Sequence, residues 1–137
     1  MTITPSVSIK LEVRQSDIPV KGNAMASGDD KYDRKVENQI LKRLENGDIA
    51  AWFDCLVTVY IEWTDDQNDY EYQGTDSLGC CNYASIKQFV KQSGGYFEDM
   101  LNEAWDSAIE DASYDDIDIS TIVKPDLTKI KPVICEF

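Results

Sequence analysis

The chain has 137 residues, 42% of them apolar and 28% charged, which is enough for one folded domain with a hydrophobic core. Its formal net charge is −13 and its pI is about 4.2. This charge disfavours phosphate-mediated binding to nucleic acid and binding to anionic membranes, and it favours basic partners.

The acidic residues are concentrated in two segments that contain no Lys or Arg. Residues Leu44 to Ile86 hold nine Asp or Glu, and residues Gln92 to Val123 hold nine more. These segments therefore carry −18, whereas the rest of the chain carries +5. Such segregation along a chain indicates a surface specialised for a partner.

The first predicted element is a half-buried strand, because apolar and polar residues alternate from Ser6 to Arg14. A loop rich in turn-forming residues follows, from Gln15 to Gly28. A helix is predicted from Asp29 to Asn46, with Ser27 or Asp29 as its N-cap. Its apolar stripe is expected to contain Tyr32, Val36, Ile40, Leu41 and Leu44.

Residues Ala51 to Trp63 predict the central strand, and the polar segment Thr64 to Asp69 predicts a hairpin loop. A third strand containing Tyr70 and Tyr72 follows. Gly74 to Asn82 is predicted to be a turn-rich connection, and Tyr83 to Gln92 a short helix. One face of the central strand is expected to hold Phe53, Cys55, Val57, Val59, Ile61 and Trp63.

Residues Gly94 to Ser120 predict an amphipathic helix followed by an acidic turn. Its buried stripe contains Phe97, Met100, Leu101, Ala104, Ala108 and Ala112, with Trp105 and Ile109 along the edge. Its opposite face carries one carboxylate per turn, from Asp99, Glu103, Asp106 and Glu110. Like charges at this spacing destabilise a helix by about 0.2–0.5 kcal/mol per pair. The absence of nearby bases suggests that the charge is used; a solvated face is the alternative.

The order strand, helix, strand, strand, helix, helix predicts an α+β fold. We expect a three-stranded antiparallel sheet with the helices packed on one face. Residues 1–120 are expected to form this single domain. Residues 121–137 are expected to form an extended C-terminal tail that packs on the domain or extends from it, in places as an edge strand.

Enzymatic activity is not predicted. The chain has no His, which excludes Ser-His and Cys-His nucleophile pairs. The adjacent pair Cys80 and Cys81 does not match the ligand spacing of zinc sites. There is no secretory signal and no apolar segment of membrane-spanning length, so a cytoplasmic location with reduced thiols is expected.

Residues Asp65 to Asp76 partly match a calcium-binding loop, with acidic or amide side chains at several ligand positions. Tyr70 occupies the position that requires Gly, and strands rather than helices flank the segment, so a solvated hairpin tip is expected instead. No metal and no cofactor is predicted. The aromatic residues Trp52, Trp63, Tyr70, Tyr72 and Tyr83 are expected to cluster around this hairpin, as core or as a surface that stacks on Arg side chains.

Two regions carry a family resemblance. VRQSDIPVKGNAMASGDD (Val13–Asp30) and GTDSLGCCNYAS with GGYFEDM (Gly74–Ser85, Gly94–Met100) resemble small uncharacterised proteins of bacteriophages, prophages and plasmids. The resemblance covers about residues 7 to 112 and leaves out the tail after Ser113. It implies no catalytic motif. It does imply a mobile-element context, in which small acidic proteins resemble the DNA mimics of anti-restriction and anti-CRISPR systems.

We therefore expect an inhibitor of a nucleic-acid-handling defence complex, such as a CRISPR effector, in the cytoplasm of a bacterial host. Its acidic surface would occupy Lys and Arg side chains that otherwise contact phosphate. The partner-binding residues are expected to be Asp99, Glu103, Asp106, Glu110, Asp111, Asp115 and Asp116, with a second patch of Glu62, Asp65, Asp66, Asp69 and Glu71. The alternatives are a non-catalytic acidic adaptor or structural protein, and a carboxylate- and metal-dependent hydrolase.

Overall fold

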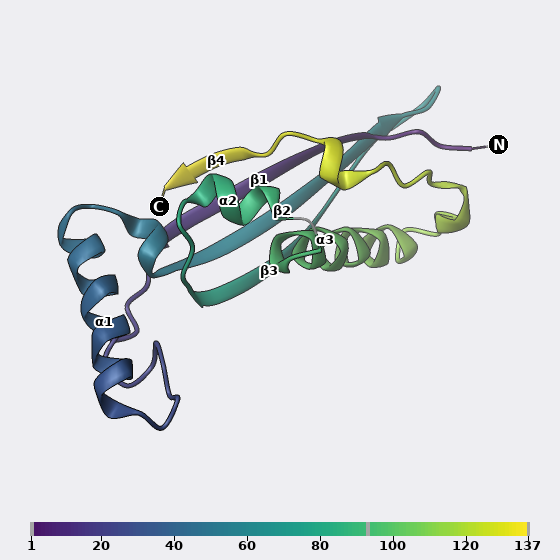
Figure 1. Ribbon diagram of the computed structural model, residues 1–137. Helices are drawn as coiled ribbons and strands as arrows, with labels where there is room; N and C mark the ends of the chain where they lie inside the picture. Colours follow the sequence, from purple (N-terminus) through teal and green to yellow (C-terminus); the bar gives the residue numbers. More distant parts are fainter. Residues whose placement is uncertain (1, 93, 137) are drawn as a thin grey trace.

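The structure is a computed structural model that describes residues 2–92 and 94–136, so residues 1, 93 and 137 lie outside the described part. It has an α+β architecture built on one four-stranded sheet (Figure 1). The strands are β1 Ser6–Gln15, β2 Phe53–Thr64, β3 Asp69–Cys81 and β4 Val133–Glu136. The helices are α1 Asp30–Glu45, α2 Ile86–Lys91 and α3 Tyr96–Ser113, with short 3₁₀ turns at Ile49–Ala51, Ile119–Thr121 and Leu127–Lys129.

The predicted three-stranded antiparallel sheet is wrong in strand number and in orientation. The order is β3-β2-β1-β4; β1, β2 and β3 are antiparallel neighbours, as expected, but β4 lies parallel to β1. β4 comes from the predicted tail and pairs with Lys10–Val13. An edge strand was expected in this tail, but its partner lies at the other end of the chain, so its parallel pairing with β1 could not be predicted from local pattern.

The predicted connection from Gly74 to Asn82 is also wrong, because β3 continues to Cys81 with a bulge opposite Phe53 and Cys55. Cys80 adopts a left-handed conformation at this bulge, with φ 57°. Gly74 serves packing and not a turn. A Cβ atom at Gly74 would collide with the backbone of α3 at Ala104 and Ala108.

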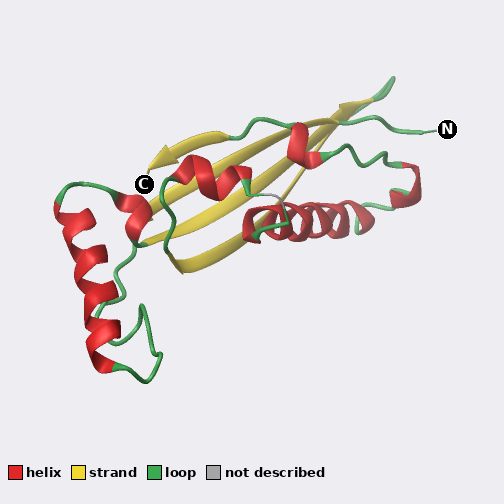
Figure 2. Cartoon of the chain, viewed as in Figure 1, coloured by secondary structure: helices red, strands yellow, loops and turns green. Residues whose placement is uncertain are grey.

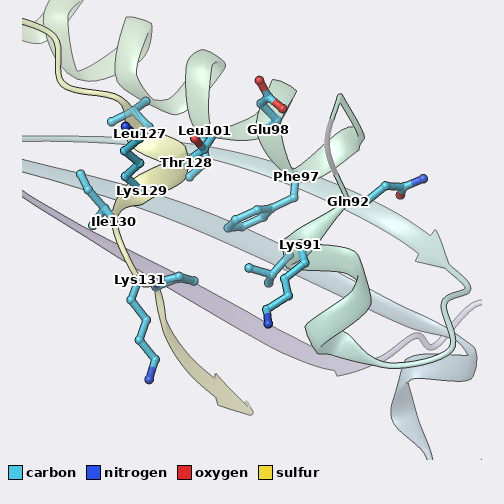
Figure 3. Close-up of a pocket in the computed structure, with 12 residues that line it drawn as sticks. Lys91, Gln92, Phe97, Glu98, Leu101, Leu127, Thr128, Lys129, Ile130 and Lys131 are labelled. Atoms are coloured by element: carbon cyan, nitrogen blue, oxygen red, sulfur yellow. The ribbon is translucent and has the colours of Figure 1, made fainter.

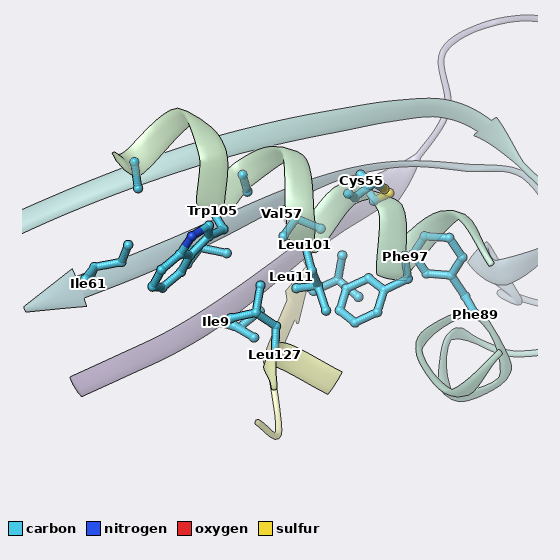
Figure 4. Close-up of a cluster of buried hydrophobic side chains, with 14 of the residues drawn as sticks. Ile9, Leu11, Cys55, Val57, Ile61, Phe89, Phe97, Leu101, Trp105 and Leu127 are labelled. Atoms are coloured by element: carbon cyan, nitrogen blue, oxygen red, sulfur yellow. The ribbon is translucent and has the colours of Figure 1, made fainter. Parts of the chain in front are cut away.

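The core lies between the sheet and the two helices α2 and α3, which cover one face of it (Figures 2 and 4). The inward side chains of β2 are buried as predicted, except that Trp63 is only half-buried. Phe97, Met100, Leu101, Ala104, Ala108 and Ala112 of α3 are also buried as predicted, and Trp105 joins them. From the C-terminal segment, Leu127 packs into the same core.

Helix α1 lies beyond the end of the sheet and not on its face, in contrast to the expectation for the helices (Figure 1). Asp29 caps it as predicted, accepting hydrogen bonds from the backbone N–H groups of Lys31 and Tyr32. Ile40 packs in a separate small cluster that contains Trp52. Tyr32, expected in the apolar stripe, is 49% exposed. Among the described residues, no helix combines the length and apolar character needed to cross a membrane.

Gly74→Ala should destabilise the protein, because the new methyl group would push α3 away from β3. Overpacking of this kind costs about 1–3 kcal/mol. Gly79→Ala is the matched control on the same strand, since its nearest neighbour would be the Oδ1 atom of Asp54 at 3.3 Å. Urea unfolding followed by circular dichroism measures both variants. If the two variants have the same free energy of unfolding, the close approach of α3 to Gly74 does not contribute to stability.

Candidate functional site

The acidic stripe, defined as Asp99, Glu103, Asp106 and Glu110, lies on the solvent side of α3, and all four residues are exposed. The opposite side of the helix is fixed by Ala104 and Ala108, which are fully buried against the sheet. The core thus holds the carboxylates in place on an 18-residue helix. Among the described residues, the recorded ion pairs lie outside this helix, at Lys10–Glu12, Arg14–Asp54 and Arg43–Asp48.

The C-terminal half of α3 is electrostatically unfavourable for the helix. Glu110 and Asp111 lie near its negative end, and the last turn contains no basic residue. The Tyr114 hydroxyl donates a hydrogen bond to Glu110 Oε1 at 3.1 Å, which satisfies that carboxylate without neutralising it. The hydrogen bond to Glu110 raises the pKa of Tyr114. The negative charge at this end therefore remains available to a partner.

Asp115 extends the acidic stripe toward the hairpin. Its carboxylate accepts a hydrogen bond of 2.8 Å from the Tyr72 hydroxyl, which ties the end of α3 to β3. Partial burial and the bond to Asp115 raise the pKa of Tyr72 to about 12. Asp116 is exposed and adopts a left-handed conformation, with φ 58°. Asp111, Asp115 and Asp116 thus follow the acidic stripe along the chain, with Asp115 anchored against the strand.

Three residues of the predicted second patch, Glu62, Asp69 and Glu71, line one depression on the surface. Glu62 and Glu71 are directly opposite each other in the register of β2 and β3, and the neighbouring pair is Trp63 and Tyr70. Successive side chains point to opposite faces of a sheet. Trp63 packs against the core on the α3 side, so Glu62 and Glu71 lie on the other face. The two acidic segments therefore do not present a single shared face.

Asp65 has a structural role in the hairpin turn. Its carboxylate accepts 2.8 Å hydrogen bonds from the backbone N–H groups of Gln67 and Asn68, and a 3.0 Å bond from the Tyr70 hydroxyl. The two backbone bonds are the main cause of its lowered pKa. Asp66 and Asp69 are exposed beside it. Of the hairpin acids, Asp65 is thus the least suited to exchange its partners for a new one.

The predicted aromatic cluster separates into three parts. Trp63 stacks on Tyr70 with ring centroids 5.2 Å apart and lies 5.5 Å from Tyr72. Trp52 belongs to the cluster beside α1 and donates a 2.7 Å hydrogen bond to the carbonyl of Ile18. Tyr83 packs on Phe89 in the main core. Of the five residues of the predicted cluster, the hairpin residues Trp63, Tyr70 and Tyr72 lie together, and Tyr72 contacts Asp115 at the acidic end of α3.

The residues of the partial calcium-loop pattern are divided between the hairpin turn and β3. Asp65 is engaged in the turn, and of the acidic residues of β3, Asp69 and Glu71 lie on one face of the sheet and Asp76 on the other. Across residues 2–92 and 94–136, no group of three or more His, Cys, Asp or Glu side chains is arranged to hold a metal ion.

A groove that the sequence did not reveal lies between α2, the start of α3 and the segment before β4 (Figure 3). Its volume is about 690 Å³. Phe97 and Leu101 line it together with the basic side chains of Lys91, Lys129 and Lys131. Three separate chain segments form the groove, so no local pattern could have predicted it. It shows that basic side chains gather at the N-terminal end of α3, away from the hairpin.

No protein-family model, curated protein or solved structure matches this chain. The resemblance to proteins of mobile elements therefore stays a prediction, and the chemistry of the surface carries the functional inference.

The four cysteines are free thiols in the structure, with Cys55 and Cys81 buried and Cys80 and Cys135 partly exposed. The neighbouring Cys81 thiol and burial raise the pKa of Cys55. We predict that iodoacetamide at pH 8 modifies Cys80 and Cys135 at least about tenfold faster than Cys55 and Cys81, because burial shields the latter two thiols from the reagent. The raised pKa of Cys55 slows it further, whereas the hydrogen bond with Cys55 lowers the pKa of Cys81, so burial alone protects Cys81. Mass spectrometry over time measures this. The urea-unfolded chain is the control, where all four should react alike; a disulfide-linked peptide pair would contradict the prediction.

The raised pKa of Tyr72 predicts a loss of stability in alkali. The folded protein favours the neutral phenol, so this contribution is present below pH 10 and is lost as the pH rises to about 12. Asp115→Asn should lower the pKa of Tyr72 toward the ordinary value of 10.0, because the hydrogen bond and the negative charge weaken. NMR titration of the tyrosine ring carbons measures the shift. Asp116→Asn is the control, and an equal shift in both variants would refute the assignment.

Proposed function

We propose that the protein is a non-catalytic inhibitor whose acidic stripe occupies the phosphate-binding Lys and Arg side chains of a nucleic-acid-handling complex. The observation that carries this proposal is the stripe itself: four exposed carboxylates at regular spacing on a helix fixed by the core, with no ion pair to them among the described residues. Carboxylates at this spacing lie about 5–6 Å apart along one side of the helix.

Regular spacing matters because the partner's cations are also regularly arranged. A channel that binds duplex nucleic acid places Lys and Arg along the phosphates, which follow each other at about 3.4 Å of axis per strand. A helix with carboxylates at roughly one and a half times that distance can engage several of these cations together. A CRISPR effector, whose channel is positively charged, is the expected class of target, as is another defence nuclease.

The aromatic side chains of the hairpin also support the binding of a basic partner at the α3 face. Trp63, Tyr70 and Tyr72 adjoin Asp115 at the end of the acidic stripe. Aromatic rings beside carboxylates suit Arg, whose guanidinium group stacks on a ring and pairs with an acid. Glu62 and Glu71 lie on the other face of the sheet and are not included in this proposed contact.

Neutralising the acidic stripe should therefore weaken inhibition without unfolding the protein. The test variant carries Asp99→Asn, Glu103→Gln, Asp106→Asn and Glu110→Gln, which keep the side-chain shapes and relieve repulsion along α3. Four surface charge pairs together contribute about 1–4 kcal/mol, so the inhibitory concentration should rise by about fivefold to about 800-fold. The measurement is DNA cleavage by purified CRISPR effectors and restriction nucleases with increasing inhibitor.

The matched control neutralises four exposed acids elsewhere, through Asp17→Asn, Asp30→Asn, Glu45→Gln and Glu136→Gln. It changes the net charge by the same amount and should inhibit like the parent. Equal weakening by both variants would mean that only total charge matters. If the parent inhibits none of the nucleases and captures no nucleic-acid-binding complex from bacterial lysate, the proposal is wrong.

A further inference from the structure

Helix α1 carries a basic face that none of the proposed contacts uses. Lys31, Lys35 and Lys42 lie on one side of the helix, with Asn38 between them, and all four are exposed. The recorded ion pairs of the described residues involve none of these lysines. A shallow depression of about 550 Å³ runs along this side, lined by Lys31, Arg34, Lys35, Asn38, Gln39 and Lys42.

The basic face of α1 has the same spacing as the acidic stripe of α3. From Lys31, the positions of the basic face follow at steps of four, three and four residues, and the same steps separate the acids from Asp99 to Glu110. Each set therefore spans about 16 Å of helix. These steps are identical when counted from either end, so the two sets match in a parallel and in an antiparallel arrangement.

The charges at the helix ends favour the antiparallel arrangement. Lys31 lies at the positive N-terminal end of α1, and Glu110 lies near the negative C-terminal end of α3, so each is unfavourable in its own helix. Antiparallel pairing brings these two residues together. It also pairs Lys35 with Asp106 and Lys42 with Asp99, and leaves Asn38 beside Glu103.

The two faces cannot meet within one molecule, because α1 stands beyond the end of the sheet and packs against the turn at Ile49–Ala51, whereas α3 lies on the face of the sheet (Figure 1). We infer that the basic face of α1 docks on the acidic stripe of α3 of a second copy of this chain, head to tail. Such a contact is heterologous, so in a pair one copy keeps a free acidic stripe and the other a free basic face, and further copies can add.

The charge of the rest of the molecule favours a second copy of the chain over nucleic acid as the partner of the basic face of α1. A net charge of −13 repels a polyanion that reaches beyond α1. The same net charge opposes self-association at low ionic strength. At about 0.1 M salt the Debye length is about 10 Å, so distant repulsion is screened while side chains in contact still attract. Association should thus be visible at about 0.1 M salt and disappear at about 1 M.

The inference does not rest on the proposed function, although both use the acidic stripe. Analytical ultracentrifugation of the whole protein at about 0.1 M NaCl tests it. Lys31→Glu, Lys35→Glu and Lys42→Glu together should lower the association constant at least about tenfold, and so should Asp99→Lys, Asp106→Lys and Glu110→Lys. Combining all six exchanges should restore association to within about threefold of the parent, because each pair is again of opposite sign.

The control variant carries Lys21→Glu, Lys87→Glu and Lys129→Glu, three exposed lysines elsewhere that give the same change of net charge. It should associate like the parent. The α1 reversal should still inhibit a nuclease target, which separates this inference from the proposed function. If circular dichroism shows that the triple Lys→Glu variant of α1 is unfolded, a Lys→Gln variant at the same three positions replaces it. The same loss of association is expected.

Three outcomes would overturn the inference: a parent that stays monomeric at every salt concentration, a six-fold exchange that fails to restore association, or an equal loss in the control. A separate experiment uses fluorescence anisotropy to measure whether the protein binds a labelled 20-base-pair duplex. Duplex binding that the α1 reversal abolishes, with the parent still monomeric, would assign the basic face of α1 to nucleic acid instead.

Discussion

The position of the acidic stripe depends on the close approach of α3 to β3. Gly74 leaves room for the backbone of α3 at Ala104 and Ala108, and those alanines are themselves fully buried. Small residues on both elements let the helix lie flat on the sheet, with Phe97 and Leu101 filling the space toward α2 and Leu127. Once this side is fixed, the helical period sends Asp99, Glu103, Asp106 and Glu110 to solvent.

Magnitudes explain why this helix tolerates so much like charge. Repulsion between carboxylates one turn apart costs about 0.2–0.5 kcal/mol per pair. Burial of one large apolar side chain contributes about 1.5–3 kcal/mol, and α3 buries several, among them Phe97, Leu101 and Trp105. Packing thus outweighs repulsion, and the fold needs no cation to neutralise the acidic stripe. Its carboxylates keep their capacity to pair with cations of another molecule.

The local sequence patterns predicted most of the helices and strands correctly. They did not predict the contacts between distant parts of the chain. Alternation and helical period located β1, β2, α1 and α3, and the buried stripe of α3 was correct residue by residue. The same patterns could not show that Gly74 is a packing position, that Val133–Glu136 pairs beside β1, or that α1 leaves the face of the sheet, since each depends on distant contacts. The separation of Glu62 and Glu71 from the α3 face was implicit in the sequence: if Trp63 points inward, Glu62 points outward.

Net charge alone describes this molecule poorly, because its acids and bases are separated in space as well as along the chain. The acidic stripe lies on α3, whereas α1 presents lysines at the same spacing and the groove beside α2 gathers three more. A basic face of the same protein and a basic partner would compete for one set of carboxylates. Three lysines interrupted by Asn38 bind more weakly than a continuous channel of Lys and Arg. A stronger partner would therefore displace the second copy, and the acidic stripe would be shielded from weaker basic surfaces until that partner arrives.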